Sequence, residues 1–424
     1  MSVTIALLGC GTVGTEVARL LTTQAEEYAH RAGGHLELIG IAVRDASAPR
    51  DPAIDPGLLT ENASELATKA DICIELIGGI EPARTLILEA IEAGASIVTG
   101  NKALLAAHGP EIYEAARKKN VDVYYEAAVA GAVPVVYALR ESLAGDKIDA
   151  VIGIVNGTTN YILDEMDSSG LSFDEALAQA QELGFAEADP TADVDGHDAA
   201  QKAAILASLA FHTRVNIEDV PVTGIRDITT DSILAAREAG YALKLLASAR
   251  RQKDGIDVRV EPTLLPLEHP LASVRGSFNA VVVEAQAADR LMFYGRGAGG
   301  APTASAVLGD VVAAAAHRVK GGEAPRELDH SGLTLIDPAE AISSFRIVLE
   351  VTDKLGVLAE ISGLFAQAGV SISTVQQEGQ PGGLAHLTIS THPAPGAAID
   401  TTLDRLRSAE YARSIVEVRR VEEA

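Results

Sequence analysis

The chain has 424 residues and a formal net charge of -25 at pH 7, and 47% of its residues are apolar. A chain of this size has enough apolar residues for two or three domain cores. Its negative charge repels nucleic acid and anionic lipid, and it contains no run of about 18 or more apolar residues that would predict a transmembrane helix. We therefore expect a multidomain protein without a nucleic acid or membrane partner.

The two cysteines, Cys10 and Cys73, each lie in an apolar run typical of a buried strand. This placement favours buried free thiols over a disulfide framework, which indicates a reducing compartment, with the cytoplasm as the default location. The opening segment MSVTIALLGC lacks the basic start and the long apolar stretch of a signal peptide, so we interpret it as a strand.

From the amino terminus to residue 129, β-branched runs alternate with amphipathic stretches rich in Ala, Leu and Glu. This alternation is typical of βαβ units that build a parallel sheet, and we expect an α/β domain of the Rossmann type over residues 1–132. The predicted strands are Val3–Leu8, Leu36–Val43, Ile72–Ile77, Ser96–Thr99 and Val121–Tyr125.

The segment GCGTVG places three glycines directly after a predicted strand and at the start of a predicted helix, which is the context that the dinucleotide-binding fingerprint requires. Gly9 permits the tight turn, Gly11 lets the backbone approach a pyrophosphate, and Gly14 allows close packing of helix and strand. The helix amino terminus, with Thr12 and Val13, supplies partial positive charge to the cofactor. A glycine-rich turn without a ligand is the weaker alternative.

The second predicted strand ends in GIAVRD, where an acid for the ribose 2′-hydroxyl or an arginine for a 2′-phosphate normally stands. Arg44 comes first, which favours NADP, although the adjacent Asp45 leaves NAD open. In the segment TGNKALL, Lys102 follows the carboxyl end of a strand, where open α/β sheets bind ligands. An ordinary surface lysine explains Lys102 equally well on this pattern alone.

Between residues 147 and 296 the pattern changes to long strands accompanied by helices, and we expect a second domain over residues 133–320. Ser172 and Glu175 have the spacing of a capping box. Met292 and Tyr294 lie in a run that we interpret as a core strand. The predicted strands are Ile148–Val155, Val258–Leu264 and Asn279–Glu284, and the predicted helices are Phe173–Leu183, Asp198–Phe211 and Thr303–His317.

Residues 321–342 form a polar segment with Gly and Pro, which predicts a linker before the last domain. Residues 343–424 then have the βαββαβ order of a ferredoxin-like fold. The predicted strands are Phe345–Val351, Ser371–Gln377, His386–Thr391 and Ser414–Val421, and the predicted helices are Val357–Ala368 and Ala398–Ala409.

The segment AEADPTADVDGHDAAQK, residues 186–202, places a group of carboxylates ahead of Lys202. Asp195, Asp198 and Lys202 are predicted to share one face of a helix, with Asp198 and Lys202 four residues apart. A surface ion pair worth about 0.3 to 0.5 kcal/mol is the simple alternative. However, the helix continues as AAILASLAF, and a buried helix with charges only at its start predicts a functional site.

Lysine suits acid-base catalysis because burial, or a second cation nearby, moves the pKa of an ammonium towards neutrality. A nearby carboxylate orients the lysine and is able to hold a substrate ammonium. We therefore interpret Asp198 and Lys202 as a catalytic pair.

Together these segments resemble the homoserine dehydrogenase family with a C-terminal ACT domain, over essentially the whole chain. The motifs that match are GCGTVG, TGNKALL, YYEAAVAGAVPV, NGTTNYIL, ELGFAEADPTADVDGHDAAQK and YGRGAGGAPTASAVLGD. The resemblance implies reversible, NAD(P)-dependent interconversion of L-homoserine and L-aspartate 4-semialdehyde, in the pathway to threonine, methionine and isoleucine. It also implies that residues 133–320 are the substrate-binding, catalytic and dimerisation domain. The implied assembly is a homodimer or homotetramer with contacts around Val133–Leu143 and the helix after Thr303.

The resemblance also implies roles for individual residues. Lys202 gives a proton to the aldehyde oxygen and takes it back in the oxidation direction, with Asp198 as its partner. Lys102 lies near the nicotinamide and the substrate, and Gly299 makes a backbone contact to the cofactor. The family often has tyrosine at position 185, so one substrate hydrogen bond is left open. The residues that hold the substrate or line its pocket are Glu187, Asp193, Gly157, Thr158 and Phe185.

The segment EAAVAGAV resembles the part of the family that binds a monovalent cation such as Na⁺ or K⁺. The implied ligands are the side chain of Glu126 and the carbonyl oxygens of Val129, Gly131 and Val133. Hard cations prefer oxygen ligands, which agrees with this set. The alternative is a strand and turn with one buried acid.

The segment VTDKLGVLAEISGLFAQAGVSISTV resembles an ACT domain, in which the turn Asp353–Gly356 and the following helix form an amino acid effector site. Threonine is the implied effector, because a pathway end product that differs chemically from the substrate needs a separate pocket. A purely structural dimerisation module that uses an exposed sheet edge is the alternative.

Two other functions compete with this one. The first is another NAD(P)-linked oxidoreductase that acts on an amino acid-like substrate. The second is a sensor that binds nucleotide and amino acid without turnover, and the intact pair of Asp198 and Lys202 argues against it.

Overall fold

The computed structural model describes residues 2–253 and 255–423. The chain divides into two compact units, one made of residues 1–157, 198–220 and 277–332 and the other of residues 158–197, 221–276 and 333–424. Both units combine segments that are distant in the sequence. No helix in the described ranges is long and apolar enough to cross a membrane.

The first unit contains a parallel sheet with the strand order β3-β2-β1-β4-β5-β6. Every neighbouring pair in it is parallel. The chain reverses its direction of winding between β1 and β4, and this switch point is where doubly wound sheets bind nucleotides. The strands are β1 Ser2–Leu8, β2 His35–Ala42, β3 Leu59–Thr60, β4 Ile72–Glu75, β5 Ser96–Thr99 and β6 Val123–Tyr124, in agreement with the prediction for all but the short β3.

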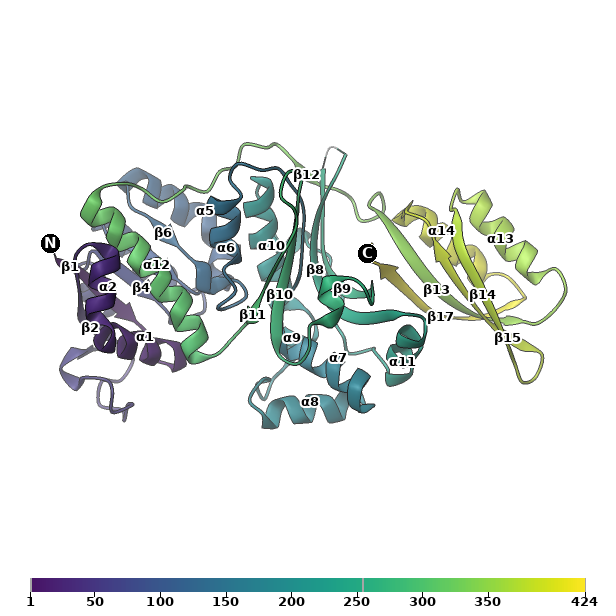
Figure 1. Ribbon diagram of the computed structural model, residues 1–424, viewed down its shortest axis with the longest axis horizontal. Helices are drawn as coiled ribbons and strands as arrows, with labels where there is room; N and C mark the ends of the chain where they lie inside the picture. Colours follow the sequence, from purple (N-terminus) through teal and green to yellow (C-terminus); the bar gives the residue numbers. More distant parts are fainter. Residues whose placement is uncertain (1, 254, 424) are drawn as a thin grey trace. The chain divides into compact units, whose positions relative to one another are not determined.

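Helix α12, Gly300–Lys320, comes from much later in the chain but packs on this sheet (Figure 1). Its residues Val307 and Val311 belong to the same buried core as Ile5 and Leu7 of β1. The predicted helix is therefore present, but its buried side covers the nucleotide-binding sheet. The other helices of this domain are α1 Thr12–Thr23, α2 Ala25–Ala32, α3 Ala63–Ala67, α4 Ala83–Glu92 and α5 Lys102–Lys119.

The remainder of the first unit includes helix α10, His197–Phe211, and three antiparallel strands in the order β11-β10-β7. Helix α10 is buried along most of its length, as its apolar sequence predicts. Strand β11 lies at the edge, where Met292 is 37% and Tyr294 53% exposed, so our interpretation of this run as a core strand is wrong. The other bounds are α6 Val135–Tyr137, β7 Ile148–Ile154, β10 Phe278–Ala285 and β11 Asp289–Arg296.

The second unit contains the hairpin of β8, Tyr241–Gln252, and β9, Gly255–Pro266, together with helices from residues 158–197 and 221–276. The predicted capping box is present: the Ser172 amide donates to Glu175 Oε2 at 2.9 Å, and the Glu175 amide donates to Ser172 Oγ at 3.4 Å. The helices are α7 Gly157–Ser169, α8 Phe173–Glu182, α9 Thr191–Val194 and α11 Thr230–Glu238.

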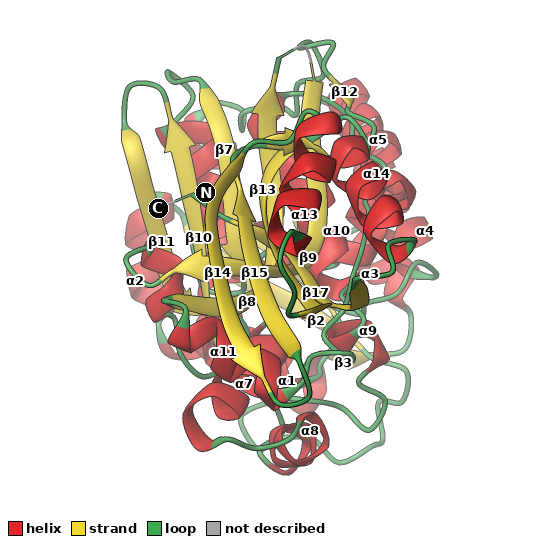
Figure 2. Cartoon of the chain, turned by 90° about the vertical axis from the view of Figure 1, so that its right-hand side faces the viewer, coloured by secondary structure: helices red, strands yellow, loops and turns green. Residues whose placement is uncertain are grey.

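The carboxyl-terminal part has the predicted ferredoxin-like order β13-α13-β14-β15-α14-β17 (Figure 2). Its sheet order is β17-β13-β15-β14, and α13 and α14 share an apolar core with it that includes Leu349, Phe365 and Ile389. Strand β17 also pairs in parallel with β9 of the hairpin, so the sheet continues from β9 into this domain. The bounds are β12 Thr334–Leu335, β13 Ile342–Thr352, α13 Val357–Gln367, β14 Ile372–Gln380, β15 Leu384–Thr391, β16 Ala394–Pro395, α14 Gly396–Arg407 and β17 Ala412–Val421.

Candidate active site

The glycine-rich loop lies between β1 and α1 and is closely packed around two of its glycines. A Cβ atom added to Gly9, whose φ is +102°, would lie 2.7 Å from the Leu76 carbonyl oxygen, and one added to Gly14 would lie 2.2 Å from the Gly9 oxygen. By contrast, a Cβ on Gly11 would meet no protein atom within 4 Å. Gly11 is also the N-cap of α1 and no side chain caps the helix, so the loop has the open approach to a helix amino terminus that a pyrophosphate needs.

The residues after β2 are those that would distinguish NADP from NAD. Arg44 is exposed directly after the strand. Asp45 is engaged locally, since its Oδ1 accepts hydrogen bonds from the Ser47 amide at 2.8 Å and the Ser47 hydroxyl at 2.6 Å. Sequence reasoning missed Arg50, which donates to the Cys10 carbonyl oxygen at 3.1 Å and so lies against the glycine-rich loop. No local pattern marks Arg50, because this contact spans 40 residues.

The amino terminus of α12 lies beside that of α1. Gly299 is the N-cap of α12 and has a φ of +123°, a conformation that favours glycine. A Cβ on the next residue, Gly300, would lie 3.3 Å from the Thr12 carbonyl oxygen. The structure therefore brings Gly299 to the neighbourhood of the glycine-rich loop.

Lys102 is the first residue of α5, at the carboxyl end of β5. The side chain of the preceding residue, Asn101, accepts a hydrogen bond from the Leu104 amide at 3.1 Å and donates one to the Gly79 carbonyl oxygen at 2.7 Å. Asn101 thereby caps the helix and ties it to the loop after β4, which fixes the position of Lys102.

Lys202 and Asp198 form a buried ion pair in the first turns of α10, and each residue is 9% exposed. Lys202 Nζ lies 2.6 Å from Asp198 Oδ2 and 2.6 Å from the Val155 carbonyl oxygen at the end of β7. Lys102 Nζ lies 3.1 Å from the other carboxylate oxygen, Asp198 Oδ1. The structure thus brings together Lys202, Asp198 and Lys102, as the sequence analysis expected.

Two asparagines that the sequence analysis did not select hold this cluster. Asn156 Nδ2 donates to Asp198 Oδ2 at 2.8 Å, and Asn279 Nδ2 donates to the Val155 carbonyl oxygen at 3.0 Å. Asn156 directly follows β7 and begins the NGTTNYIL motif, a position that could have identified it. Asn279 lies on β10, and no sequence motif marks it as a site residue.

The charges of the cluster keep Asp198 ionised. Burial alone would raise the pKa of this carboxyl, but the ammonium groups of Lys202 and Lys102 outweigh burial and hold the pKa well below its usual range. The carboxylate is shared between two ammonium groups, so the cluster is cationic overall. An ammonium has three donors, and Asp198 and Val155 accept two from Lys202, which leaves one for a substrate oxygen.

The remaining predicted substrate residues, apart from Gly157, lie in the second unit. Thr158 Oγ1 donates to the Phe185 carbonyl oxygen at 2.6 Å, and the rings of Tyr161 and Phe185 are 5.0 Å apart. Glu187 is exposed and Asp193 is half-buried. The division between the units falls after Gly157 and again after His197, next to two of the site residues in sequence.

Asp195 does not belong to this cluster. It lies at the C-cap of α9 and pairs with Arg226, while Gly196, with a φ of +86°, separates it from α10. Our expectation that Asp195 shares a helix face with Asp198 and Lys202 is therefore wrong. Asp189 accepts a hydrogen bond from the Thr191 amide at 3.1 Å, a local role at the start of α9.

Glu126, the predicted cation ligand, is buried in the first unit. Its carboxylate accepts hydrogen bonds from the Val136 amide at 3.0 Å and the Tyr137 amide at 2.6 Å, and its own amide donates to Asp310 Oδ2 at 2.8 Å. Burial raises the pKa of Glu126 to about 7 and, with the charge of Glu126, raises the pKa of Asp310 well above its ordinary value. Two neighbouring buried acids suit a site for a cation.

The other three predicted ligands of this cation would contribute backbone carbonyl oxygens. Gly131 has a φ of +57°, and a Cβ atom added to it would lie 2.4 Å from the Gly297 carbonyl oxygen. Val129 and Val133 are fully buried. Within residues 2–253 and 255–423, no group of three or more His, Cys, Asp and Glu side chains could hold a metal ion. A cation at Glu126 would therefore depend on carbonyl oxygens.

Comparison with known proteins identifies the family. Residues 9–126 match the NAD-binding domain of homoserine dehydrogenase, residues 134–312 match the homoserine dehydrogenase family, and residues 345–411 match the ACT domain. The homoserine dehydrogenase of Corynebacterium glutamicum is 54% identical over 428 residues, covering 99% of this chain and 96% of that protein. The chain belongs to the homoserine dehydrogenase family. It is therefore an NAD(P)-dependent oxidoreductase.

Solved structures agree with this assignment. A homoserine dehydrogenase from Thiobacillus denitrificans has a TM-score of 0.92 and 37% identity, covering 100% of this chain and 99% of that one. A hyperthermophilic archaeal homoserine dehydrogenase in complex with NADPH has a TM-score of 0.64 and 27% identity, covering 77% of this chain and 100% of that one. The resemblance stated from the sequence motifs is confirmed.

Proposed function

We propose that this chain interconverts L-homoserine and L-aspartate 4-semialdehyde, with Lys202 as the acid-base residue, in the biosynthesis of threonine, methionine and isoleucine. The observation that supports the proposal most directly is the buried cluster of Lys202, Asp198 and Lys102. In oxidation, the neutral amine form of Lys202 takes the proton of the substrate hydroxyl, and in reduction its ammonium form returns a proton to the aldehyde oxygen. The nicotinamide, when bound, accepts or supplies the hydride.

Asp198 and Val155 orient the Lys202 side chain for this transfer. Asp198 is fixed in turn by Asn156, so the reacting nitrogen has little freedom to move. Lys102 places a second positive charge beside the same carboxylate, and we propose that it lies near the substrate and the nicotinamide.

We propose that carboxylates of the second unit hold the substrate ammonium. Glu187 and Asp193 are the acids in this role, and Gly157, Thr158 and Phe185 line the pocket. The accessibility of Glu187 and Asp193 supports this role, because neither carboxylate is fully buried. Replacing Glu187 or Asp193 without changing the Michaelis constant for homoserine would contradict the assignment.

NADP is the proposed cofactor, held by the glycine-rich loop with Gly9, Gly11, Thr12, Val13 and Gly14. The exposed Arg44 supports binding of a 2′-phosphate, and the local engagement of Asp45 makes that acid less available to a ribose hydroxyl. Arg50 and Gly299 lie beside the same loop and would complete the surroundings of the cofactor.

We propose that the chain forms a homodimer or homotetramer in the cytoplasm. Tyr137 is 45% exposed within the predicted contact region Val133–Leu143, and the nearby strand β11 exposes Met292 and Tyr294. Large apolar side chains that a single chain leaves exposed favour an interface. A monomeric mass in solution, measured by light scattering, would exclude this assembly.

Replacing Lys202 with Met tests the acid-base role, because Met has a similar length and no proton to transfer. We expect kcat to fall by about 100-fold or more, the usual contribution of a general acid-base group. Binding of NADPH, followed by the fluorescence of its reduced nicotinamide, should change by less than about twofold, since the lysine is not part of the glycine-rich loop. The exposed Lys69→Met is the matched control, and a Lys202→Met enzyme with the turnover of that control would refute the role.

Replacing Arg44 with Ser tests the cofactor preference. The Michaelis constant for NADP should rise about tenfold or more, because a charge-assisted hydrogen bond contributes about 1.5 to 3 kcal/mol and 1.4 kcal/mol is a factor of ten. The Michaelis constant for NAD should stay within about twofold of its wild-type value. Arg31→Ser, which removes an exposed arginine on α2, serves as the control. A wild-type enzyme that prefers NAD would end the proposal.

Replacing Glu126 with Gln tests the cation site. The thermal midpoint of the wild-type protein should be higher in KCl or NaCl than in tetramethylammonium chloride of equal ionic strength, because a bound ion stabilises the folded state. Glu126→Gln should show no such difference, whereas Glu65→Gln, on the exposed surface, should retain it. Equal wild-type midpoints in all three salts would contradict cation binding.

We propose that threonine regulates the enzyme through the ACT domain, at the turn Asp353–Gly356. There Leu355 is fully exposed and Asp353 Oδ1 accepts a hydrogen bond from Gln377 at 3.1 Å, which places an open turn beside β14. Threonine should lower the rate of the full chain and raise its thermal midpoint, while valine, with a methyl group in place of the hydroxyl, should do neither. Saturating threonine that alters neither quantity would exclude this regulation.

A further inference from the structure

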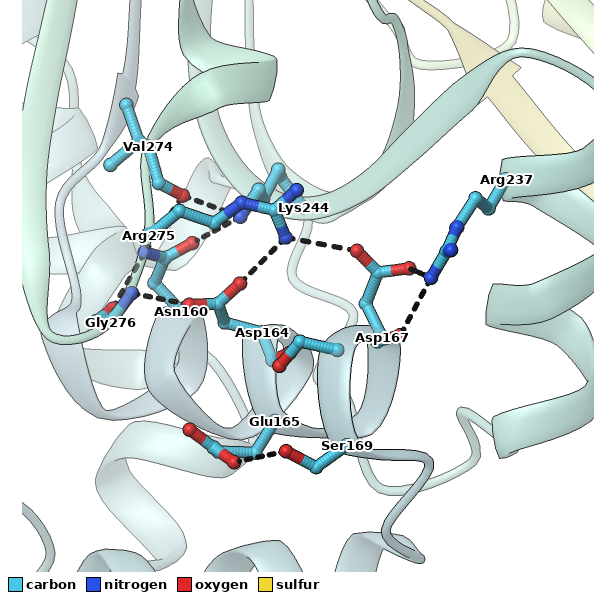
Figure 3. A network of polar contacts seen from close by, with 11 residues as sticks. Asn160, Asp164, Glu165, Asp167, Ser169, Arg237, Lys244, Val274, Arg275 and Gly276 are labelled. Carbon is cyan, nitrogen blue, oxygen red and sulfur yellow. Dashed lines mark hydrogen bonds and ion pairs between the residues drawn. The ribbon is translucent and has the colours of Figure 1, made fainter.

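Lys244, on strand β8, is a buried lysine outside the acid-base cluster, and it is 3% exposed. Its Nζ donates to Asn160 Oδ1 at 2.9 Å and to the Val274 carbonyl oxygen at 2.7 Å (Figure 3). Taking an ammonium group out of water costs several kcal/mol before its contacts are counted. A buried lysine held by two neutral oxygens therefore needs a structural or functional reason.

Asn160 connects this lysine to the segment before β10. It lies in the first turn of α7 and is 1% exposed. While its oxygen accepts from Lys244, its Nδ2 donates to the Gly276 carbonyl oxygen at 2.8 Å. Lys244 contacts both segments that this bond joins, because it binds Asn160 on α7 and the Val274 oxygen two residues before Gly276. The first turn of α7 and residues 274–276 are consequently held together around one ammonium group.

The same turn of α7 begins with two residues proposed to line the substrate pocket. Gly157 is so close to Ser277 that an added Cβ would lie 2.5 Å from the Ser277 carbonyl oxygen. Thr158 donates through its hydroxyl to the Phe185 carbonyl oxygen at 2.6 Å. A small displacement of residues 274–277 would therefore displace the start of α7 and the pocket residues on it.

The later turns of α7 are attached to the same segment by a separate set of contacts (Figure 3). Arg275 pairs with Asp164 Oδ1 at 2.7 Å and with Asp167 Oδ2 at 2.9 Å. The Gly276 amide donates to Asp164 Oδ2 at 2.6 Å. The Arg275 side chain is 56% exposed and that of Asp164 is 11% exposed, so solvent reaches these ion pairs from the arginine side and reduces what each contributes.

We propose that Lys244 is a positioning residue for the substrate pocket, which it fixes through Asn160 and the Val274 carbonyl oxygen at the first turn of α7. This inference rests on the proposed roles of Gly157 and Thr158 in binding homoserine. Burial lowers the pKa of Lys244 to about 8. A neutral amine still has two donors for its two acceptors, so the connection persists in either protonation state.

Lys244→Met tests the proposal, because Met fills a similar volume and has no donor. We expect the Michaelis constant for homoserine to rise about tenfold or more. Both kcat and the Michaelis constant for NADP should stay within about twofold of their wild-type values. Contacts that hold the substrate equally in the ground and transition states affect the Michaelis constant alone. Arg275→Met is the matched control, since it removes only the ion pairs to Asp164 and Asp167 in the later turns of α7. It should leave the Michaelis constant for homoserine within about twofold of the wild-type value.

A second variant covers the case in which Lys244→Met does not fold. Asn160→Ser keeps the lysine and removes the carboxamide that joins it to Gly276, so it should produce the same selective rise. The double variant should be no worse than the more affected single variant, because both changes break one connection.

Three results would overturn the proposal. They are a folded Lys244→Met or Asn160→Ser enzyme with a wild-type constant for homoserine, an equal rise in the constants for homoserine and NADP, and the same rise in Arg275→Met. Failure of the wild-type enzyme to oxidise homoserine is a distinct outcome, because it removes the proposed function itself.

Discussion

The buried ion pair between Lys202 and Asp198 is the interaction on which the rest of the site depends. An ammonium and a carboxylate that are each 9% exposed persist only if their remaining donors and acceptors are satisfied. Asn156 and the Val155 carbonyl oxygen, at the end of β7, satisfy them from one side. The pair therefore fixes the register of α10 against β7, and it leaves the lysine with a single direction for further bonding.

The position of Lys102, at the edge of the nucleotide-binding sheet, also depends on the Asp198 carboxylate. A cation at a helix amino terminus opposes the helix dipole and costs about 0.3 to 1 kcal/mol. Helix α5 nevertheless begins with this lysine, which Asn101 holds in place and which contacts Asp198 at 3.1 Å. The contact with the Asp198 carboxylate explains why a lysine stands at position 102, because helix α5 alone would be more stable without a cation at its amino terminus.

Local patterns in the sequence predicted much of this arrangement. The glycine-rich loop, the capping box at Ser172 and the pairing of Asp198 with Lys202 each depend on residues within a few positions of one another. Asp195, three residues before Asp198, also has a helical spacing, but the break at Gly196 separates it from α10, and it pairs with Arg226. A helical pattern in the sequence does not show where one helix ends and the next begins.

Contacts between distant segments account for what the sequence did not predict. Strand β8, Tyr241–Gln252, is rich in Ala, Leu, Arg and Lys, which favour helices, but it pairs along its length with β9. The strand and the buried Lys244 on it were not predicted. Arg50 approaches the glycine-rich loop, and α12 covers the nucleotide-binding sheet, only because the folded chain brings them there. The exposed Met292 and Tyr294 likewise reflect the edge position of β11.

The most direct measurement is a crystal structure of the chain with NADP and homoserine bound. If Lys202 transfers the proton, its Nζ will lie about 2.6 to 3.2 Å from the substrate hydroxyl oxygen, a hydrogen-bonding distance, while it still contacts Asp198. A homoserine whose hydroxyl lies beyond the reach of Lys202, beside a different acid or base, would contradict the account.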